Sequence, residues 1–433
     1  MHLLGTKEPV RNIYGAGGAG GPLGAGGAGG PLGAGGAGGA GAAGGAGGAG
    51  GEVLSPFTSG ALIRNRDGIV GNWERVEGTN QPTPHPFGAP GNVGLWSGRA
   101  RSIVFAQELL QPLEFALSEV ADSGTPPTDQ QNWATLNHRP PVAPNTLDTM
   151  PGDPGPPFLF FAMRRPTVQI FAEQMEWLRR YADLRMDRAS EILSQVLDFK
   201  AFYSSIMDFG LRRTEYTLEM LEVVHAATIA IEMRFKNAMA CRRPSEISPQ
   251  VQPIIQTPGH SALPSGHSTE SYAIATVLSH LADVRAAELG KPPADDTKIQ
   301  LQRQAFRIAA NRTVAGVHFP VDSAAGAYLG MTLGTYFVAR MYVAAGMDCD
   351  APNVFQYLFD GRAYRSINDP NLSPDFDPTV ARKAFDGDAG IDNPAYQRNA
   401  FADGGGNDIP MPISPVGSAE IGAFWSSVLA EWS

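Results

Sequence analysis

The sequence predicts an all-α helical bundle flanked by segments of irregular structure. Apolar residues recur at spacings of three and four from Pro166 onward, which marks one face of an α-helix. No stretch alternates clearly between apolar and polar residues, as a half-buried strand would. Glycine and proline, 51 and 35 residues in a chain of 433, are concentrated on either side of this helical region. The bundle is therefore expected to lie between two regions that contribute little to the core.

Composition divides the chain into four predicted segments. The first is a Gly/Ala-rich arm in which glycine recurs at every third position from Gly15 to Gly39, as in a flexible tether or an ordered glycine-rich assembly element. The second and fourth are rich in turn-forming residues and are expected to wrap the bundle. The segments are a Gly/Ala-rich N-terminal arm over 1–51, a wrapping segment over 52–165, a helical catalytic core over 166–345 and a C-terminal tail over 346–433.

The wrapping segments carry few structural signals of their own. One helix is expected near Ala100–Asp122. His85 and His138 stand near prolines, and this setting favours loop histidines that face solvent. The tail ends in an apolar piece that contains Phe424 and Trp432 and is expected to lie against the bundle or against a partner subunit.

The helical core is expected to contain five helices. The first is long and amphipathic, and proline is suited to the first position of the last. Because Lys236 and Arg312 close two helices, while Ser265 and His318 precede or begin two others, the polar residues can meet at one end of a bundle. The expected helices run from Pro166 through Val196, from before Leu221 to about Lys236, from Ser265, from Asp296 to Asn311, and from Pro320 to about Ala345.

Charge and cysteine content exclude several classes of protein. The chain has 33 basic and 43 acidic residues and a net charge of −10, which argues against nucleic acid or an anionic membrane surface as a general partner. Its two cysteines, Cys241 and Cys349, form neither a disulfide framework nor a zinc-ligand pattern.

The sequence offers no clear membrane span. The longest uncharged stretch, residues 323–339, contains serine, threonine and several glycines and is better explained as a buried helix than as a transmembrane anchor. The first 14 residues include Lys7, Glu8 and Arg11 and no apolar core segment, so no secretory signal peptide is expected. Cytoplasmic residence is the default expectation.

Three short polar blocks follow one another in the helical core: Lys236-x6-Arg243-Pro244, then Pro264-Ser265-Gly266-His267, then Arg312-x5-His318-x3-Asp322. The middle block stands at a predicted helix start, where unpaired N–H groups and the helix dipole favour an anion. Two arginines can make forked hydrogen bonds, and the lysine adds a compact charge. If the blocks converge, they form a cage for a tetrahedral oxyanion such as phosphate or vanadate.

The two histidines complete this predicted site. One histidine must approach the phosphorus or vanadium atom of the oxyanion as a nucleophile or ligand. The other must exchange a proton with the oxygen on the opposite side of that atom. Asp322 stands four residues after His318 and can orient its ring.

These blocks resemble the signature of the superfamily of type 2 phosphatidic acid phosphatases and vanadium-dependent haloperoxidases, over roughly residues 166–345. The resemblance implies a helical bundle of that type, in which His318 is the axial ligand of vanadium or the phosphoryl-accepting nucleophile and His267 is the acid/base. One departure is Asn311, where the family usually has serine. The residues that the resemblance assigns to oxyanion binding are Lys236, Arg243, Ser265, Gly266 and Arg312.

His260 bears on the choice between the two chemistries of this superfamily. It stands seven residues before His267, where the sequence resembles bromide-oxidising haloperoxidases, and it could assist halide approach or proton transfer. The alternative is a loop histidine that faces water. The short intervals 244–264 and 267–312 are, in contrast, similar to compact bacterial acid phosphatases.

The resemblance favours a vanadium-dependent haloperoxidase of the bromoperoxidase type. It implies vanadate as cofactor, hydrogen peroxide, halide and a small organic acceptor as partners, and a homodimer or higher homo-oligomer. The first alternative is a metal-independent acid phosphatase that works through a phosphohistidine. The second is an assembly protein with a vestigial site.

Overall fold

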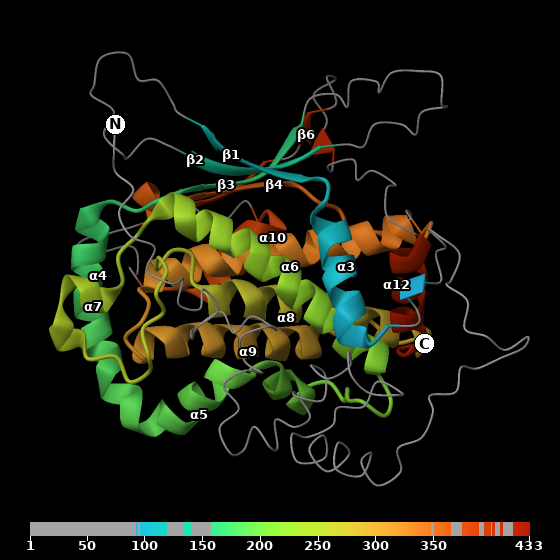
Figure 1. Cartoon of the computed structure of the whole chain (residues 1–433), viewed down its shortest axis with the longest axis horizontal. Helices are drawn as coiled ribbons and strands as arrows, with labels where there is room; N and C mark the ends of the chain where they lie inside the picture. Colours follow the sequence, from blue (N-terminus) through green and yellow to red (C-terminus); the bar gives the residue numbers. More distant parts are fainter. Residues whose placement is uncertain are drawn as a thin grey trace, which may run out of the picture. The chain divides into compact units, whose positions relative to one another are not determined.

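The computed structural model describes residues 92–93, 96–118, 133–139, 157–347, 350–364, 375–388, 394–399, 401–402, 408–409 and 419–433. The glycine-rich arm, His85 and Cys349 lie outside the described residues. Within them, helices form the centre of the fold and one sheet covers it (Figure 1).

Four long helices form the core: α6 (Glu215–Met239), α8 (Gly266–Glu288), α9 (Asp295–Val314) and α10 (Pro320–Ala344). They correspond to the last four predicted helices of the bundle. Helix α8 packs against the other three, and α10 is buried along nearly its whole length. Gly326 permits the close approach of α10 to α8, because a β-carbon there would lie 2.7 Å from the carbonyl oxygen of Ser265. No described helix is long and apolar enough to cross a membrane.

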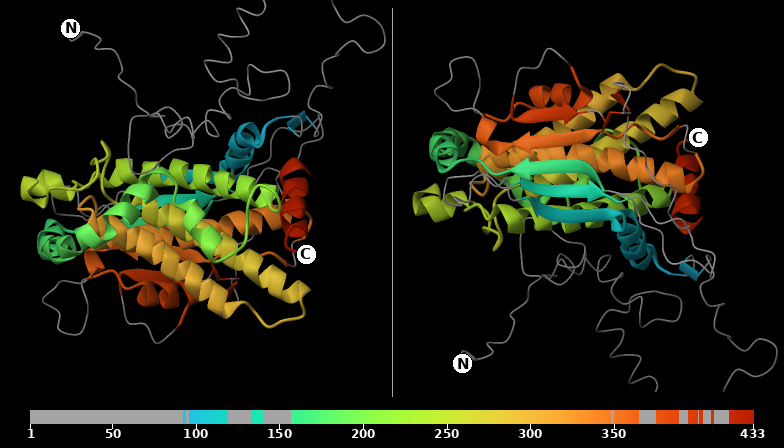
Figure 2. Two further views of the ribbon diagram at one scale, coloured as in Figure 1. Left: turned by 90° about the horizontal axis from the view of Figure 1, so that it is seen from below. Right: turned by 90° about the horizontal axis from the view of Figure 1, so that it is seen from above.

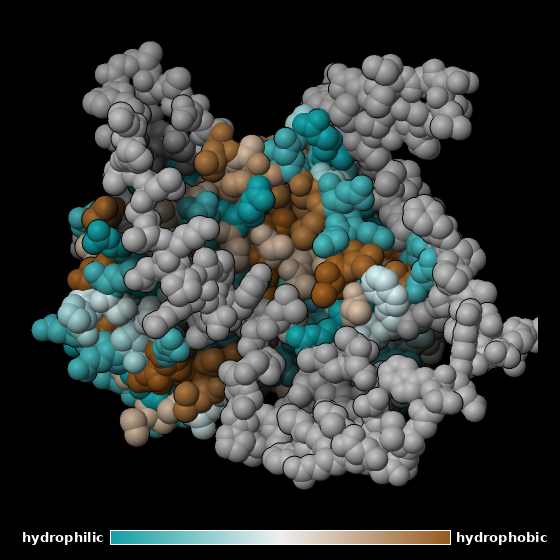
Figure 3. All heavy atoms as spheres, viewed as in Figure 1, coloured by the Kyte–Doolittle hydropathy of each residue, from teal (hydrophilic) through white to brown (hydrophobic). Residues whose placement is uncertain are grey.

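The first predicted helix is interrupted. Helix α4 (Val168–Tyr181) is followed by a 3₁₀ turn at Ala182–Leu184 and then by α5 (Arg185–Leu197). The apolar spacing continues through this turn, so the sequence pattern alone did not indicate the break. Helix α5 lies against α9, and hydrophobic side chains gather on the surface near it (Figure 3). Met186 and Leu193 of α5 are exposed.

The expectation of a purely α-helical fold is wrong. A five-stranded mixed sheet, in the order β1-β2-β3-β4-β5, lies over the helices, and only the β3–β4 pair is parallel (Figure 2). Strand β3 is an almost continuous apolar run, and such a short run does not distinguish a strand from a buried helix. The strands are β1 (Leu113–Ser118), β2 (Trp133–His138), β3 (Phe158–Arg164), β4 (Gln356–Asp360) and β5 (Tyr396–Asn399).

Two further predictions for the first wrapping segment are wrong. The helix expected over Ala100–Asp122 ends early, since α3 covers Gly98–Leu110 and β1 follows. Pro112 explains the early end, because proline lacks the N–H that a continuing helix needs. His138 is not a solvent-facing loop residue but the buried last residue of β2, with its Nδ1 3.0 Å from the Tyr336 hydroxyl.

The C-terminal part of the chain adds small elements to the bundle and the sheet. Helix α12 (Ala419–Ala430) packs against α10 and α6, with Phe424 and Trp425 buried. The carboxylate of Glu431 accepts hydrogen bonds from the backbone N–H groups of Tyr216 and Thr217 at the start of α6. The remaining elements are α7 (Pro244–Ile247), α11 (Pro378–Asp386), β6 (Phe401–Ala402) and β7 (Asp408–Ile409).

Candidate active site

The three polar blocks converge at one end of the helical core. Lys236 is in the last turn of α6, and Arg312 is in the last turn of α9. Ser265 is the N-cap residue of α8, and His318 stands two residues before α10. Arg243 is the N-cap residue of α7, which lies at this end of the bundle (Figure 1). These side chains are buried. We call this group the oxyanion cage, after the role that the sequence predicts for it.

His318 is oriented from both sides of its ring. Its Nδ1 lies 3.1 Å from Asp322 Oδ2, and its Nε2 lies 2.8 Å from Arg243 Nη1. Since a carboxylate accepts and a guanidinium donates, Nδ1 carries the proton and Nε2 presents a lone pair. Asp322 is itself held by the backbone N–H of Phe319, 2.9 Å from Oδ2. The lone pair of His318 is therefore on Nε2, where it faces Arg243 Nη1.

Arg243 links the cage to His260. Its Nε donates to the carbonyl oxygen of His260 at 2.9 Å, and its Nη2 lies 3.1 Å from His260 Nδ1. The charge of His260 also lowers the pKa of His318, after the larger effects of burial, Arg243 and Lys236. The partly buried His260 ring is thus beside the cage and in contact with it, and the alternative of a loop histidine directed only toward water is wrong.

Ser265 and Lys236 form another wall of the cage. The backbone N–H of Ser265 donates to the carbonyl oxygen of Asp322 at 2.9 Å, which ties the start of α8 to α10. Lys236 Nζ donates to the carbonyl oxygen of Pro264. The hydroxyl of Ser265 is buried and has no hydrogen-bond partner among the described residues. A bound anion would provide an acceptor for this hydroxyl.

His267 lies in the first turn of α8 and is almost fully buried. Its Nε2 lies 3.1 Å from the carbonyl oxygen of Gln195, so Nε2 is the donor and Nδ1 remains as the acceptor in the neutral ring. The ring also packs against Phe199, with 5.6 Å between centroids. Helix α5 and the residues after it thus cover the proposed acid/base.

Gln195 is a contact residue that sequence reasoning missed. Its side-chain oxygen accepts from Arg312 Nη2 at 2.9 Å and from Asn311 Nδ2 at 3.0 Å. Arg312 Nε and Nη1 are buried and have no partner in the described part of the chain. Gln195 therefore fixes one edge of the guanidinium and leaves two donors for an anion. Gln195 is one of several polar residues in α5, so the sequence carried no specific signal of this contact.

The residue that departs from the family pattern takes part in the same network. Asn311 donates to Glu191 Oε1 at 2.9 Å, and its own side-chain oxygen accepts from Arg188 Nη1 at 3.1 Å. Glu191 in turn pairs with Arg307 at 2.7 Å. Asn311 thus fastens α9 to α5 beside the cage and, like Gln195, is a positioning residue for Arg312.

Burial lowers the pKa of each cation in the cage without neutralising the arginines. The pKa of Lys236 falls to about 8 and the pKa values of Arg243 and Arg312 fall to about 10, in each case mainly through desolvation. Burial also lowers the pKa of His318 and of His267 well below the ordinary value. At neutral pH the cage therefore presents cations with two neutral imidazoles, an arrangement suited to an oxyanion.

Substitution of Gln195 tests its positioning role. We expect Gln195→Met to weaken phosphate binding by about 5- to 100-fold, because removal of one partner leaves a buried charged donor unsatisfied. Isothermal titration calorimetry with inorganic phosphate measures this change. Gln302→Met is the matched control on α9, about 15 Å along the helix from Arg312, and should bind phosphate like the wild type. Equal affinities of the Gln195 variant and the wild type would contradict the assignment.

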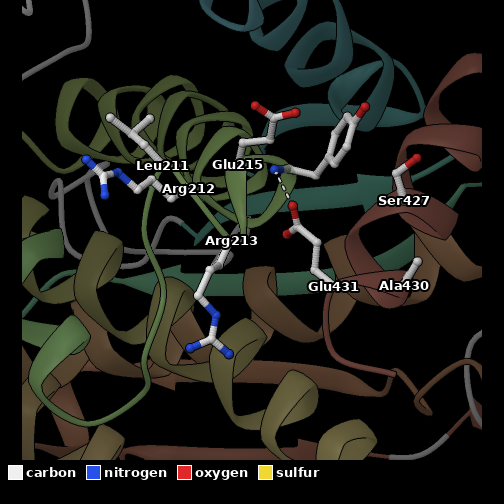
Figure 4. A pocket seen from close by; sticks show the side chains of 8 residues that line it. Leu211, Arg212, Arg213, Glu215, Ser427, Ala430 and Glu431 are labelled. Carbon is white, nitrogen blue, oxygen red and sulfur yellow. Dashed lines mark hydrogen bonds between the residues drawn. The ribbon is translucent and has the colours of Figure 1, made fainter.

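A surface cavity of about 620 Å³ lies elsewhere on the molecule. It is lined by the loop before α6 and the last turn of α12, including Arg212, Arg213 and Glu431 (Figure 4). Tyr216 at this cavity and Lys236 are 20 residues apart on one helix, a separation of about 30 Å. The cavity is therefore not part of the oxyanion cage.

One family model matches the part of the chain that contains the cage. Residues 217–345 match the family model described as PAP2 superfamily. The matched region begins in α6 and ends just after α10, so it contains every residue from Lys236 to Asp322 and leaves out Gln195. No curated protein matches the chain. Residues 217–345, which include the three polar blocks, are thus similar to the PAP2 superfamily.

Proposed function

We propose that this protein is a vanadium-dependent haloperoxidase that oxidises bromide or iodide with hydrogen peroxide to hypohalous acid, which then halogenates small organic acceptors. PAP2 superfamily membership permits both haloperoxidase and phosphatase activity. The observation that favours the former is the position of His260, whose ring contacts Arg243 and lies beside His318. A third imidazole at the cage can carry a proton to or from an oxidant, which a phosphohistidine mechanism does not require.

The residues of the cage fit vanadate. Arg312 Nε, Arg312 Nη1 and Ser265 Oγ are buried donors without protein partners among the described residues, and an oxyanion would satisfy them. His318 Nε2 offers a neutral imidazole lone pair, which suits a transition-metal ion. His318 would hold vanadium, while Lys236 and Arg243 would join Arg312 and Ser265 around the oxygens. Vanadate bound there supplies activation of hydrogen peroxide for two-electron oxidation of a halide.

The chain's own residues orient the reactants and move protons. Asp322 keeps the Nδ1 proton on His318, so that Nε2 stays available. His267 Nδ1 can accept a proton in the neutral ring, while its Nε2–H stays on the carbonyl oxygen of Gln195. A negative charge in the cage raises the pKa of His267 and thereby opposes the lowering caused by burial. His267 would then accept and return a proton during turnover.

A metal-independent acid phosphatase remains the alternative, and the short intervals 244–264 and 267–312, similar to those of compact bacterial acid phosphatases, favour it. The lone pair of His318 Nε2 would serve a phosphorus nucleophile as well as a vanadium ligand. In that reaction His267 would first be protonated on Nδ1 while the anion is bound. His318 would then form the bond to phosphorus as the bond to the alkoxide leaving group breaks, and the alkoxide would take the Nδ1 proton of His267. Water would then cleave the phosphohistidine to give inorganic phosphate.

One pair of assays separates these functions. We expect purified protein incubated with orthovanadate to brominate a dione indicator when given bromide and hydrogen peroxide. Omission of vanadate, or competition by excess phosphate, should remove this activity, because both anions use one cage. Rapid hydrolysis of p-nitrophenyl phosphate without bromination would overturn the haloperoxidase proposal. Inactivity in both assays would favour an assembly protein with a vestigial site.

A further inference from the structure

Two fully buried carboxyl groups lie directly behind the oxyanion cage, outside the three polar blocks. Glu232 is one helical turn before Lys236 on α6, and Glu270 is one turn after Gly266 on α8. Both face Gly266, since a β-carbon there would lie 2.7 Å from Glu232 Oε1 and 3.2 Å from Glu270 Oε1. The two carboxyl groups thus converge on the backbone of a residue that forms the cage.

The hydrogen bonds of this pair are incomplete. Among the described residues, both oxygens of Glu232 and Oε1 of Glu270 have no hydrogen-bond partner, although each is buried. The fourth oxygen, Glu270 Oε2, lies 3.1 Å from His225 Nε2. Two neighbouring buried carboxylates cannot both stay ionised at low cost when their oxygens lack donors, so protonation of the pair is favoured.

The groups that oppose protonation are the cations of the cage. The charged and titratable side chains that act on the pair are Lys236, Arg243, Arg312, Lys200 and His225. Of these, Lys200 is already paired with Glu222 at 3.0 Å, and burial keeps the pKa of His225 at about 3, so that its ring is neutral. Three cations of the oxyanion cage thus provide the positive charge that can hold the carboxyl pair ionised.

We propose that Glu232 and Glu270 form a proton-accepting pair that takes up a proton when an oxyanion enters the cage and returns it when the anion leaves. The reasoning is electrostatic: an anion that binds Lys236, Arg243 and Arg312 competes with the carboxylates for the same positive charge. The proton comes from solvent and ends on a carboxyl oxygen, with no other bond made or broken. The inference rests on the proposed oxyanion site, and it applies to vanadate and phosphate alike.

The pKa shifts set the pH range in which this uptake can occur. Burial, followed by the charge of Glu270, raises the pKa of Glu232 well above its ordinary value, and burial also raises the pKa of Glu270 to about 8. Without an anion the pair therefore begins to ionise only above neutral pH, and proton uptake on binding is expected in that range. Both residues are positioning residues, since the neighbouring cations, and not the carboxyl groups, contact the anion. An anion that binds with proton uptake binds more weakly as pH rises.

Calorimetry with sulfate tests the proposal independently of turnover. Sulfate is a tetrahedral dianion that does not titrate near neutral pH, so protons taken up on binding must go to the protein. Titrations of the full chain in two buffers with different ionisation enthalpies give the number of protons. Above the pKa of about 8 of Glu270, where the anion-free pair is ionised, we expect the wild type to take up close to one proton and its sulfate affinity to fall by about tenfold per pH unit.

Isosteric variants identify the groups that take up the proton. Glu232→Gln with Glu270→Gln should lower proton uptake and flatten the pH dependence above neutral pH, whereas Gln302→Met, on α9 and away from the cage, should leave uptake in place. Each single Gln variant is measured as well, so that a folding defect in the double variant does not decide the outcome. Wild-type binding without proton uptake, or uptake that persists undiminished in variants lacking both carboxyl groups, would overturn the inference. Absence of sulfate binding would overturn the oxyanion site itself.

Discussion

Replacement of His318 by alanine is expected to abolish both oxyanion retention and turnover, with a loss of activity on the order of 10⁴-fold or more. The ring of His318 supplies the nitrogen Nε2. Asp322 fixes the orientation of the ring on one side, and Arg243 fixes it on the other. Without it, the central atom loses its proposed ligand or nucleophile. Vanadate content after gel filtration and the rate of bromination measure the two effects.

A matched control separates this effect from a general loss of stability. His280 is, like His318, a largely buried histidine with a polar partner, the hydroxyl of Tyr342 at 2.9 Å. It lies 13 residues beyond His267 on α8 and away from the cage. His280→Ala should therefore retain vanadate and turnover at nearly wild-type levels. If the His318 variant still retained vanadate while the control lost it, the assignment of His318 as the ligand would be wrong.

The convergence of the site could be predicted because each block is tied to a helix end. Helix ends are marked by strong local signals, such as Pro320 at the first position of α10 and Ser265 before α8. Once the ends were placed, an antiparallel bundle brought Lys236, Arg312 and His318 to one side. The roles of these residues remain predictions that the proposed variants test.

The sheet could not be predicted from the same reasoning because its strands depend on distant partners. Strand β3 pairs with β4, which lies almost 200 residues later, and the pairing is parallel. Such pairing leaves no turn signal between the strands, and a short apolar run such as β3 also fits a buried helix. The burial of His138 follows from this sheet and was missed for the same reason.

The supporting residues of the cage were hidden for a different reason. Gln195 and Glu232 are polar residues on buried faces of their helices. Their importance arises from contacts between helices: Gln195 with Arg312 across α5 and α9, and Glu232 with Gly266 across α6 and α8. Periodicity predicts which face of a helix is buried, but it does not show which polar group on that face has a partner.

Replacement of His267 by alanine is expected to leave the oxyanion bound and to lower turnover by about 10²- to 10⁴-fold, the usual contribution of a general acid/base. The anion should remain because its proposed contacts come from Lys236, Arg243, Arg312 and His318, none of which bonds to His267 in the described hydrogen-bond network. Turnover should fall because the exchangeable proton loses its carrier. Vanadate content and the rate of bromination are measured in the same samples.

The pH profile distinguishes a proton carrier from a structural residue. Burial holds the pKa of His267 well below its ordinary value, so the free enzyme carries the neutral ring, and a bound anion should raise that pKa toward the working range. The dependence of the bromination rate on pH should therefore show one titrating group fewer in His267→Ala than in the wild type. Added imidazole, which fits the space left by the ring, should restore part of the rate. Phe199→Leu removes the aromatic contact with His267 but keeps the imidazole, and should retain that titrating group. Equal loss of vanadate in His267→Ala and His318→Ala would contradict the division of roles, because it would mean that both rings hold the anion and neither acts mainly on protons.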